Sequence, residues 1–260
     1  MKLRNHQSTS LALLSLGTAL AVGAAQAAPL DDMVAFDAAY IPALATSTGA
    51  SQDAAVAPKA LGAMAALQRQ WPALQQRLLI TWGARPPVGW QRTLTRVGRH
   101  INVAADASNK SDWMHAHEVL EPVRIELMNA RLSQGMDYFV DHLTAFHTPM
   151  ETLALAGSTL RPDQLNATRR AELTRAYAKA RTLWRRIEQQ PVDAKAYGLS
   201  GARLAQLRKA IEDEGSALEQ LSQALRETDD ARLLKAAAAI KPPFARAFTA
   251  FGQPEAVGTR

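Results

Sequence analysis

The sequence predicts an all-α protein, an antiparallel helical bundle of about eight helices that follows an N-terminal signal peptide. Three observations lead to this class. Alanine, the residue with the highest helix propensity, supplies 51 of the 260 residues. Aromatic residues, which favour strands, make up only 6%. Apolar residues also recur at helical spacing along almost the whole chain, and at 47% hydrophobic composition they suffice to form a core.

Residues 1–27 have the composition of a cleavable export signal. Lys2 and Arg4 form a basic head, Leu11 to Ala25 is apolar, and Ala25-Gln26-Ala27 is a small-residue cleavage site. A retained membrane anchor is the alternative, but the apolar run is shorter than the roughly 20 residues that a membrane span needs. We therefore expect a periplasmic protein that begins at Ala28 and has no transmembrane segment after cleavage. Nucleic acid is not an expected partner in that compartment.

The helical periodicity is interrupted at turn-forming residues, and these interruptions delimit the expected helices. Glycine, proline and asparagine mark most of the breaks, and Ser47 to Gly49 is one of them. Pro162 suits a first helical turn, and Asp229-Asp230 is a typical helix start. The expected helices span 31–46, 54–80, 88–106, 111–133, 137–156, 163–190, 199–227 and 229–251.

A faint internal repeat predicts two helical units, 28–135 and 136–260, packed as one compact domain. Four expected helices fall in each unit, and three landmarks recur at similar positions. The landmark pairs are Pro42 with Pro149, Trp71 with Trp184, and Pro122 with Pro242. Because alanine-rich amphipathic helices resemble one another by chance, the landmarks predict a duplication without establishing it.

Composition and motifs exclude several kinds of chemistry. The chain has no cysteine, which excludes disulfides, thiolate metal sites, covalently attached c-type haem and thiol nucleophiles. It contains no G-x-S-x-G, no phosphate-binding loop and no H-E-x-x-H. The sequence therefore favours a binding protein over an enzyme.

The histidines of the exported chain are concentrated in one region. All five lie between residues 100 and 147, and residues 158–260 contain neither histidine nor methionine. Two of them belong to matching motifs, His117-x-x-x-Glu121 and His147-x-x-x-Glu151. Each motif places an imidazole and a carboxylate one turn apart on the same helix face.

The two motifs are expected to lie at the same height if their helices form an antiparallel hairpin through Gly135. In such a hairpin His117 is level with Glu151, and Glu121 is level with His147. Helical geometry makes the pairs converge for one hand of the hairpin and diverge for the other. The sequence does not specify the hand. By the same argument Glu126 and His142 form a separate pair between the helices.

A converging set of two imidazoles and two carboxylates predicts a site for copper, zinc or iron. A smaller group of residues could add accessory ligands, and its thioethers would suit cuprous copper. These accessory candidates are Asp37, Tyr40, His115, Met128, Met150 and His142.

Three alternatives remain open at this stage. Histidine and glutamate four residues apart also form ordinary helix-surface pairs, and Arg124 could simply neutralise Glu121. The bundle could instead be a metal-free adaptor for a periplasmic partner protein or an apolar ligand. Non-covalent haem binding is the third, with His115 or His100 and Met128 as axial ligands.

Overall fold

The computed structural model shows an all-α bundle, which confirms the predicted class. It describes residues 17–252 and, as far as side chains are concerned, residues 29–252. Over this range the chain forms helices and short 3-10 turns with no strand. The helices are α1 (Gly17–Gln52), α2 (Ala57–Ile80), α3 (Trp90–Asn109), α4 (Trp113–Ser133), α5 (Phe139–Thr159), α6 (Ala167–Gln189), α7 (Gly201–Arg226), α8 (Asp230–Ala238) and α9 (Lys241–Thr249). Single 3-10 turns are η1 (Ala54–Val56), η2 (Pro162–Gln164) and η3 (Ala250–Gly252).

Four of the described helices begin where a short polar side chain precedes an amphipathic segment. At the starts of α4, α6, α7 and α8 this side chain accepts a hydrogen bond from a backbone N–H of the first turn, because these N–H groups have no partner inside the helix. The capping residues are Asp112, Asn166, Ser200 and Asp229.

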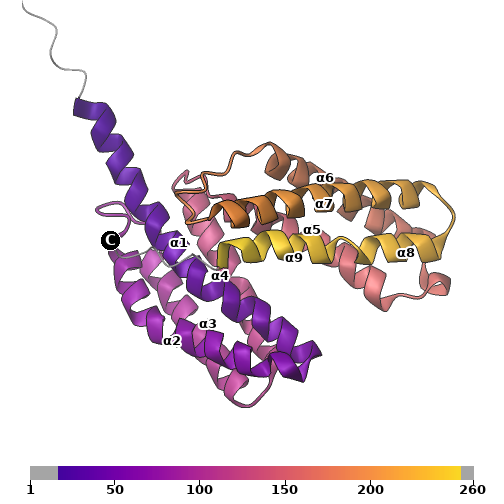
Figure 1. The fold of residues 1–260 in the computed structure, drawn as a ribbon, viewed down its shortest axis with the longest axis horizontal. Coiled ribbons are helices and arrows are strands. Elements are labelled where there is room, and N and C mark those ends of the chain that lie inside the picture. Colours follow the sequence, from indigo (N-terminus) through magenta and orange to yellow (C-terminus); the bar gives the residue numbers. More distant parts are fainter. Residues whose placement is uncertain (1–16, 253–260) are drawn as a thin grey trace, which may run out of the picture.

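The helices pack as two neighbouring groups, α1–α4 and α5–α9 (Figure 1). In the first group α1 lies against α2 and α4, and α3 closes the ring between α2 and α4. In the second group α5 packs on α6 and α8, while α7 packs on α6 and α9. The groups meet where α1 contacts α9 and η3 and where α4 contacts α5. Most buried apolar side chains form one hydrophobic cluster that runs through both groups.

Three expected helix boundaries are wrong. The first helix begins at Gly17 rather than at residue 31. The break expected at Ser47 to Gly49 is absent, because α1 continues to Gln52. The Thr46 and Ser47 hydroxyls donate to the carbonyls of Pro42 and Ala43 at 2.6 and 2.8 Å, so these polar groups are satisfied inside the helix. The expected helix 229–251 is divided into α8 and α9. The two prolines that follow Lys241 lack N–H groups and cannot continue α8.

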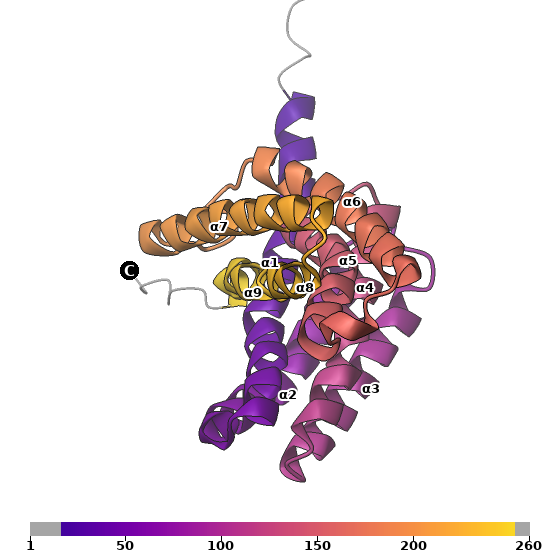
Figure 2. The ribbon, with the colours of Figure 1, turned by 90° about the vertical axis from the view of Figure 1, so that its right-hand side faces the viewer.

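The N-terminal turns of α1 project beyond the other helices, as the two perpendicular views show (Figures 1 and 2). Residues 1–16 of the predicted signal peptide lie outside the described residues. Among the helices that the structure describes, none combines the length and apolar character needed to cross a bilayer.

Candidate functional site

The two His–Glu motifs converge at the junction of the two helix groups, so α4 and α5 have the hand that brings them together. Glu121 lies between the two imidazoles. Its Oε1 is 3.3 Å from His117 Nε2, and its Oε2 is 4.0 Å from His147 Nδ1. The other nitrogen of His147, Nε2, is 3.8 Å from Glu151 Oε2. These four side chains form the His–Glu cluster. Each is 19–35% exposed, so the cluster is accessible from solvent.

The expected hairpin register is correct for one pair only. Glu121 and His147 are level, as predicted, but His117 and Glu151 make no contact. The reason is that α4 and α5 touch over a short stretch, since each packs mainly within its own group. Gly135, with φ of 67°, makes the turn between them.

The first helix orients His117. Its Nδ1 lies 3.2 Å from the Leu44 carbonyl oxygen and 2.8 Å from Thr48 Oγ1. Because a carbonyl oxygen can only accept, the tautomer that fits this contact carries its proton on Nδ1. The lone pair of Nε2 in the neutral ring then faces Glu121. The sequence does not predict Thr48 as a site residue, because residues 47–49 are expected to interrupt the first helix.

Two cations neutralise the carboxylates of the His–Glu cluster. Arg124 forms an ion pair with Glu121, which realises the pairing considered from the sequence. Arg124 is 5% exposed, stands over the Phe248 ring and leaves its Nε without a hydrogen-bond partner. Lys241, at the start of α9, lies 3.0 Å from Glu151 Oε1. Lys241 could not be predicted from the sequence, because it is 90 residues away from its partner.

His147 is held in its neutral form. Burial, followed by the neighbouring Arg124, Lys241 and His117, lowers the pKa of His147 to about 2. Its ring packs against Phe244 with centroids 5.6 Å apart and has no hydrogen bond on either nitrogen. Oε2 of Glu151, which faces His147, is buried and also lacks a hydrogen-bond partner. In the described part of the chain, His147 Nε2 and Glu151 Oε2 therefore face each other at 3.8 Å without a hydrogen bond.

The side chains are not positioned as a preformed metal site. Within residues 29–252 no group of three or more His, Asp or Glu side chains is placed so that it could hold a metal ion. Two ligand atoms that each lie about 2 Å from one tetrahedral ion are roughly 3.3 Å apart, so the His147–Glu121 separation of 4.0 Å would have to shorten for both to bind it.

The two accessory candidates on α1 contact the α4–α5 region without joining the His–Glu cluster. Tyr40 donates through its hydroxyl to the Leu120 carbonyl at 2.9 Å, and burial raises the pKa of Tyr40. Asp37 accepts a 2.6 Å hydrogen bond from the Tyr138 hydroxyl. Burial raises the pKa of Asp37 to about 6, opposed by Arg131 and by the Tyr138 hydrogen bond.

Asp37 belongs to a second buried network that the sequence did not reveal. Arg131 binds Asp141 with two hydrogen bonds of 2.9 and 2.5 Å and stands over the Tyr138 ring at 4.5 Å. All four residues are at most 5% exposed. They link α1, α4 and the start of α5 across the junction of the two groups.

The remaining sequence candidates lie outside the His–Glu cluster. His115 is exposed in the first turn of α4, Met128 is partly exposed, and Met150 is fully buried in the core. His142 contacts Asp137 at 3.1 Å.

The predicted Glu126–His142 pair is wrong. Glu126 instead pairs with Arg96 at 2.9 Å and lies 3.7 Å from His100, both on α3. The cause is again the packing of α4 on α3, which turns Glu126 away from α5.

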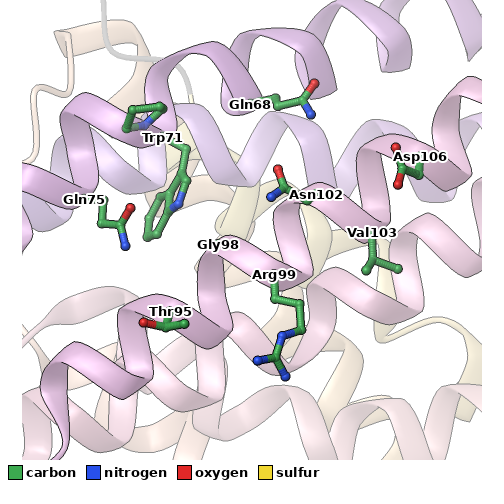
Figure 3. A pocket seen from close by; sticks show the side chains of 10 residues that line it. Gln68, Trp71, Gln75, Thr95, Gly98, Arg99, Asn102, Val103 and Asp106 are labelled. Atoms are coloured by element: carbon green, nitrogen blue, oxygen red, sulfur yellow. The ribbon is translucent and has the colours of Figure 1, made fainter.

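A separate cleft of about 490 Å³ opens between α2 and α3 (Figure 3). Its floor includes Trp71, whose indole edge lies against Gly98. A Cβ at position 98 would lie 2.7 Å from Trp71 Nε1, so the indole can approach this closely only because residue 98 is glycine. Polar side chains line the rim, among them Gln68, Arg99 and Asn102. The cleft shares no residue with the His–Glu cluster.

Comparisons of the chain with protein-family models, with curated proteins and with solved structures find no match in any of the three. The functional conclusion is therefore drawn from the residues and their geometry.

Proposed function

We propose that this protein binds a divalent transition-metal ion at the His–Glu cluster, with His117, Glu121 and His147 as the principal ligands and Glu151 beside them. The observation that carries the proposal is the convergence of metal-ligand atoms that make no hydrogen bond to one another: the two nitrogens of His147 lie 4.0 Å from Glu121 Oε2 and 3.8 Å from Glu151 Oε2, and the latter oxygen is buried without a partner. A cation among these atoms would be bound by them.

The surroundings of His117 support a ligand role. A metal-binding histidine commonly donates its second ring N–H to a carbonyl or carboxylate, which fixes the tautomer and the ring orientation. Leu44 accepts in this way, and Thr48 lies beside the same nitrogen. His147 needs no deprotonation near neutral pH, since its pKa is lowered to about 2.

Binding requires a small rearrangement. His147 and Glu121 would close from 4.0 Å onto a shared ion, and Arg124 would yield its bond to Glu121. Imidazole and carboxylate ligands suit zinc, cupric copper or ferrous iron. Met150, which is buried in the core, offers no support for a cuprous site.

Calorimetric titration of the purified protein with Zn²⁺ and Cu²⁺ tests the proposal. We expect about one ion per chain, and Glu121→Gln or His147→Gln should weaken binding by at least about tenfold, since each removes a ligand. Arg124→Met should tighten binding, because it removes a competing cation. Thr48→Val should weaken it by about tenfold through the orientation of His117.

His142→Gln is the matched control, because His142 is partly exposed and lies outside the cluster. A wild type that binds no metal, and whose thermal melt is unchanged by EDTA and by added ions, would contradict the proposal. The cluster would then be a structural ion-pair network in a metal-free binding module. A Soret band on haem titration would instead favour the haem-binding alternative.

We further propose export to the periplasm through residues 1–27. The basic head, the apolar stretch from Leu11 to Ala25 and the Ala25-Gln26-Ala27 site support this. Mass spectrometry of the protein recovered from expressing bacteria should give a chain that starts at Ala28. A mass that includes residues 1–27 would contradict cleavage.

We also propose that α1–α4 and α5–α9 arose by duplication. Trp71 of α2 lies against Gly98 of α3, with its Nε1 2.7 Å from the Cβ position, and Trp184 Nε1 of α6 lies 3.9 Å from the Cβ position of Gly215 of α7, where Glu188 Oε1 is nearer. Seven of the eight buried positions in α4 have a buried counterpart 120 residues later. By that offset Glu121 corresponds to Lys241, so the two copies would differ at the cluster. Failure of the two groups to superpose with matching helix order would contradict the duplication.

A further inference from the structure

The α2–α3 region carries a pronounced excess of positive charge. Residues 54–105 contain seven Lys and Arg and no Asp or Glu, a formal charge of +7. The whole chain has a net charge of +6, so the remaining residues together carry −1. Arg77 and Arg96 pair with Asp32 and Glu126. In the described part of the chain the other five basic residues form no ion pair: Lys59, Arg69, Arg85, Arg92 and Arg99.

The connection between α2 and α3 is an apolar tip on this basic region. Ile80 is 75% exposed and Val88 is 100% exposed, so neither contributes appreciably to the core. The tip has a rigid base, because Trp82 and Trp90 pack edge to face at 6.1 Å and Trp90 donates to the Leu78 carbonyl at 2.6 Å. The tip is therefore held in place while its two aliphatic side chains face solvent.

Basic side chains surround the tip. The Arg92 guanidinium lies next to Gly89, directly beside Val88, and Arg85 is an exposed residue of the connection itself. Aliphatic side chains flanked by arginine are typical of segments that sit at a membrane surface, where the apolar part enters the lipid and the cations bind headgroups.

The tip lies at the end of the first group from which the N-terminus of α1 emerges. Helices α1 and α2 are antiparallel, and Arg77 near the end of α2 pairs with Asp32 of α1 at 3.2 Å. The connection that follows α2 therefore lies beside the N-terminal turns of α1, which project from the same end of the molecule (Figures 1 and 2).

We propose that the α2–α3 tip docks on a bilayer containing anionic lipids, with Ile80 and Val88 in the interfacial layer and Arg85 and Arg92 on headgroup phosphates. The charge of the region selects an anionic surface. The two exposed aliphatic side chains favour a lipid surface over a soluble polyanion, which would leave them in water. This proposal is independent of metal binding and involves none of the His–Glu cluster residues.

Vesicle co-sedimentation tests the proposal, using phosphatidylcholine vesicles with and without phosphatidylglycerol. The mass of the purified chain is determined first, and all variants are compared in the same form, so that any contribution from residues 1–27 is common to all. The wild type should bind only the anionic vesicles, with affinity that falls as salt rises. The Ile80→Ser/Val88→Ser variant should bind at least about tenfold more weakly, because it removes the buried apolar area. Arg85→Gln/Arg92→Gln should also weaken binding and reduce the salt dependence.

Met114→Ser is the matched control, because Met114 is 51% exposed at the start of α4, the opposite end of the first group. Trp82 at the tip provides a second readout, a blue shift of fluorescence on anionic vesicles that the double serine variant lacks. Equal sedimentation of the wild type and the double serine variant would overturn the proposal. So would wild-type binding to soluble polyphosphate with none to anionic vesicles, which would assign the basic region to a soluble polyanion.

Discussion

Glu214 on α7 provides the most direct test of the electrostatics in the core. Its side chain is 0% exposed, and neither carboxylate oxygen has a hydrogen-bond partner. Burial raises the pKa of Glu214 from 4.5 to about 9, and the Phe244 backbone and Arg246 oppose this only partly. The folded protein therefore holds Glu214 protonated near neutral pH, while the unfolded chain ionises it.

The sign of the effect on stability follows from this difference. Below pH 4.5 both states are protonated and Glu214 imposes no ionisation penalty. Between pH 4.5 and about 9 only the unfolded state loses the proton, so the free energy of unfolding falls as pH rises. Each pH unit in that window costs about 1.4 kcal/mol, which gives a penalty of about 3 kcal/mol at pH 7.

Glu214→Met removes the carboxyl and keeps the volume of the side chain. We expect the free energy of unfolding of the variant to exceed that of the wild type by about 3 kcal/mol more at pH 7 than at pH 4.5. Urea denaturation followed by circular dichroism at both pH values measures this difference. Glu212→Met is the matched control: Glu212 is exposed on the same helix, and its substitution should change stability by less than about 0.5 kcal/mol. The same advantage for Glu214→Met at both pH values would refute the reasoning.

Two further predictions concern α1 and α5. Asp37→Asn keeps an acceptor for Tyr138 but cannot ionise. Because burial raises the folded pKa of Asp37 from 3.8 to about 6, wild-type stability falls over that interval, and the variant should gain about 2 kcal/mol on wild type between pH 3.8 and pH 6. Denaturation at the two pH values measures it, and a variant that tracks the wild type would contradict the shift. Gly157→Ala should cost more than about 2 kcal/mol, because a Cβ there would lie 2.4 Å from the α8 backbone. Gly62 lies inside α2 with open space around it, so Gly62→Ala should raise the free energy of unfolding by up to about 1 kcal/mol. Thermal or urea unfolding measures both changes, and equal effects of the two substitutions would contradict the packing of α5 on α8.

Much of the architecture could be predicted from the sequence because its signals are local. Helix periodicity, capping side chains and turn residues act over a few positions, so the fold class and most helix limits followed from them. The boundaries that differ from expectation have identifiable local causes. Ser47 satisfies its hydroxyl inside α1, where a turn was expected, and two prolines after Lys241 divide the last predicted helix.

The same distinction applies to the candidate site. Each His–Glu pair is a property of one helix, and its spacing alone places His117 beside Glu121 and His147 beside Glu151. The sequence left open whether the two pairs meet, because that depends on how α4 crosses α5. The crossing is fixed by packing within the two groups and by the buried Arg131–Asp141 pair.

The sequence by itself determined the helices, the absence of thiol chemistry and the two His–Glu motifs. Only the tertiary structure brought Thr48 to His117 across 69 residues and Lys241 to Glu151 across 90, and only it showed Glu214 buried without a partner. The physical reason is range. Periodicity and capping depend on neighbours within about one helical turn, whereas burial and charge pairing depend on which faces of distant helices meet.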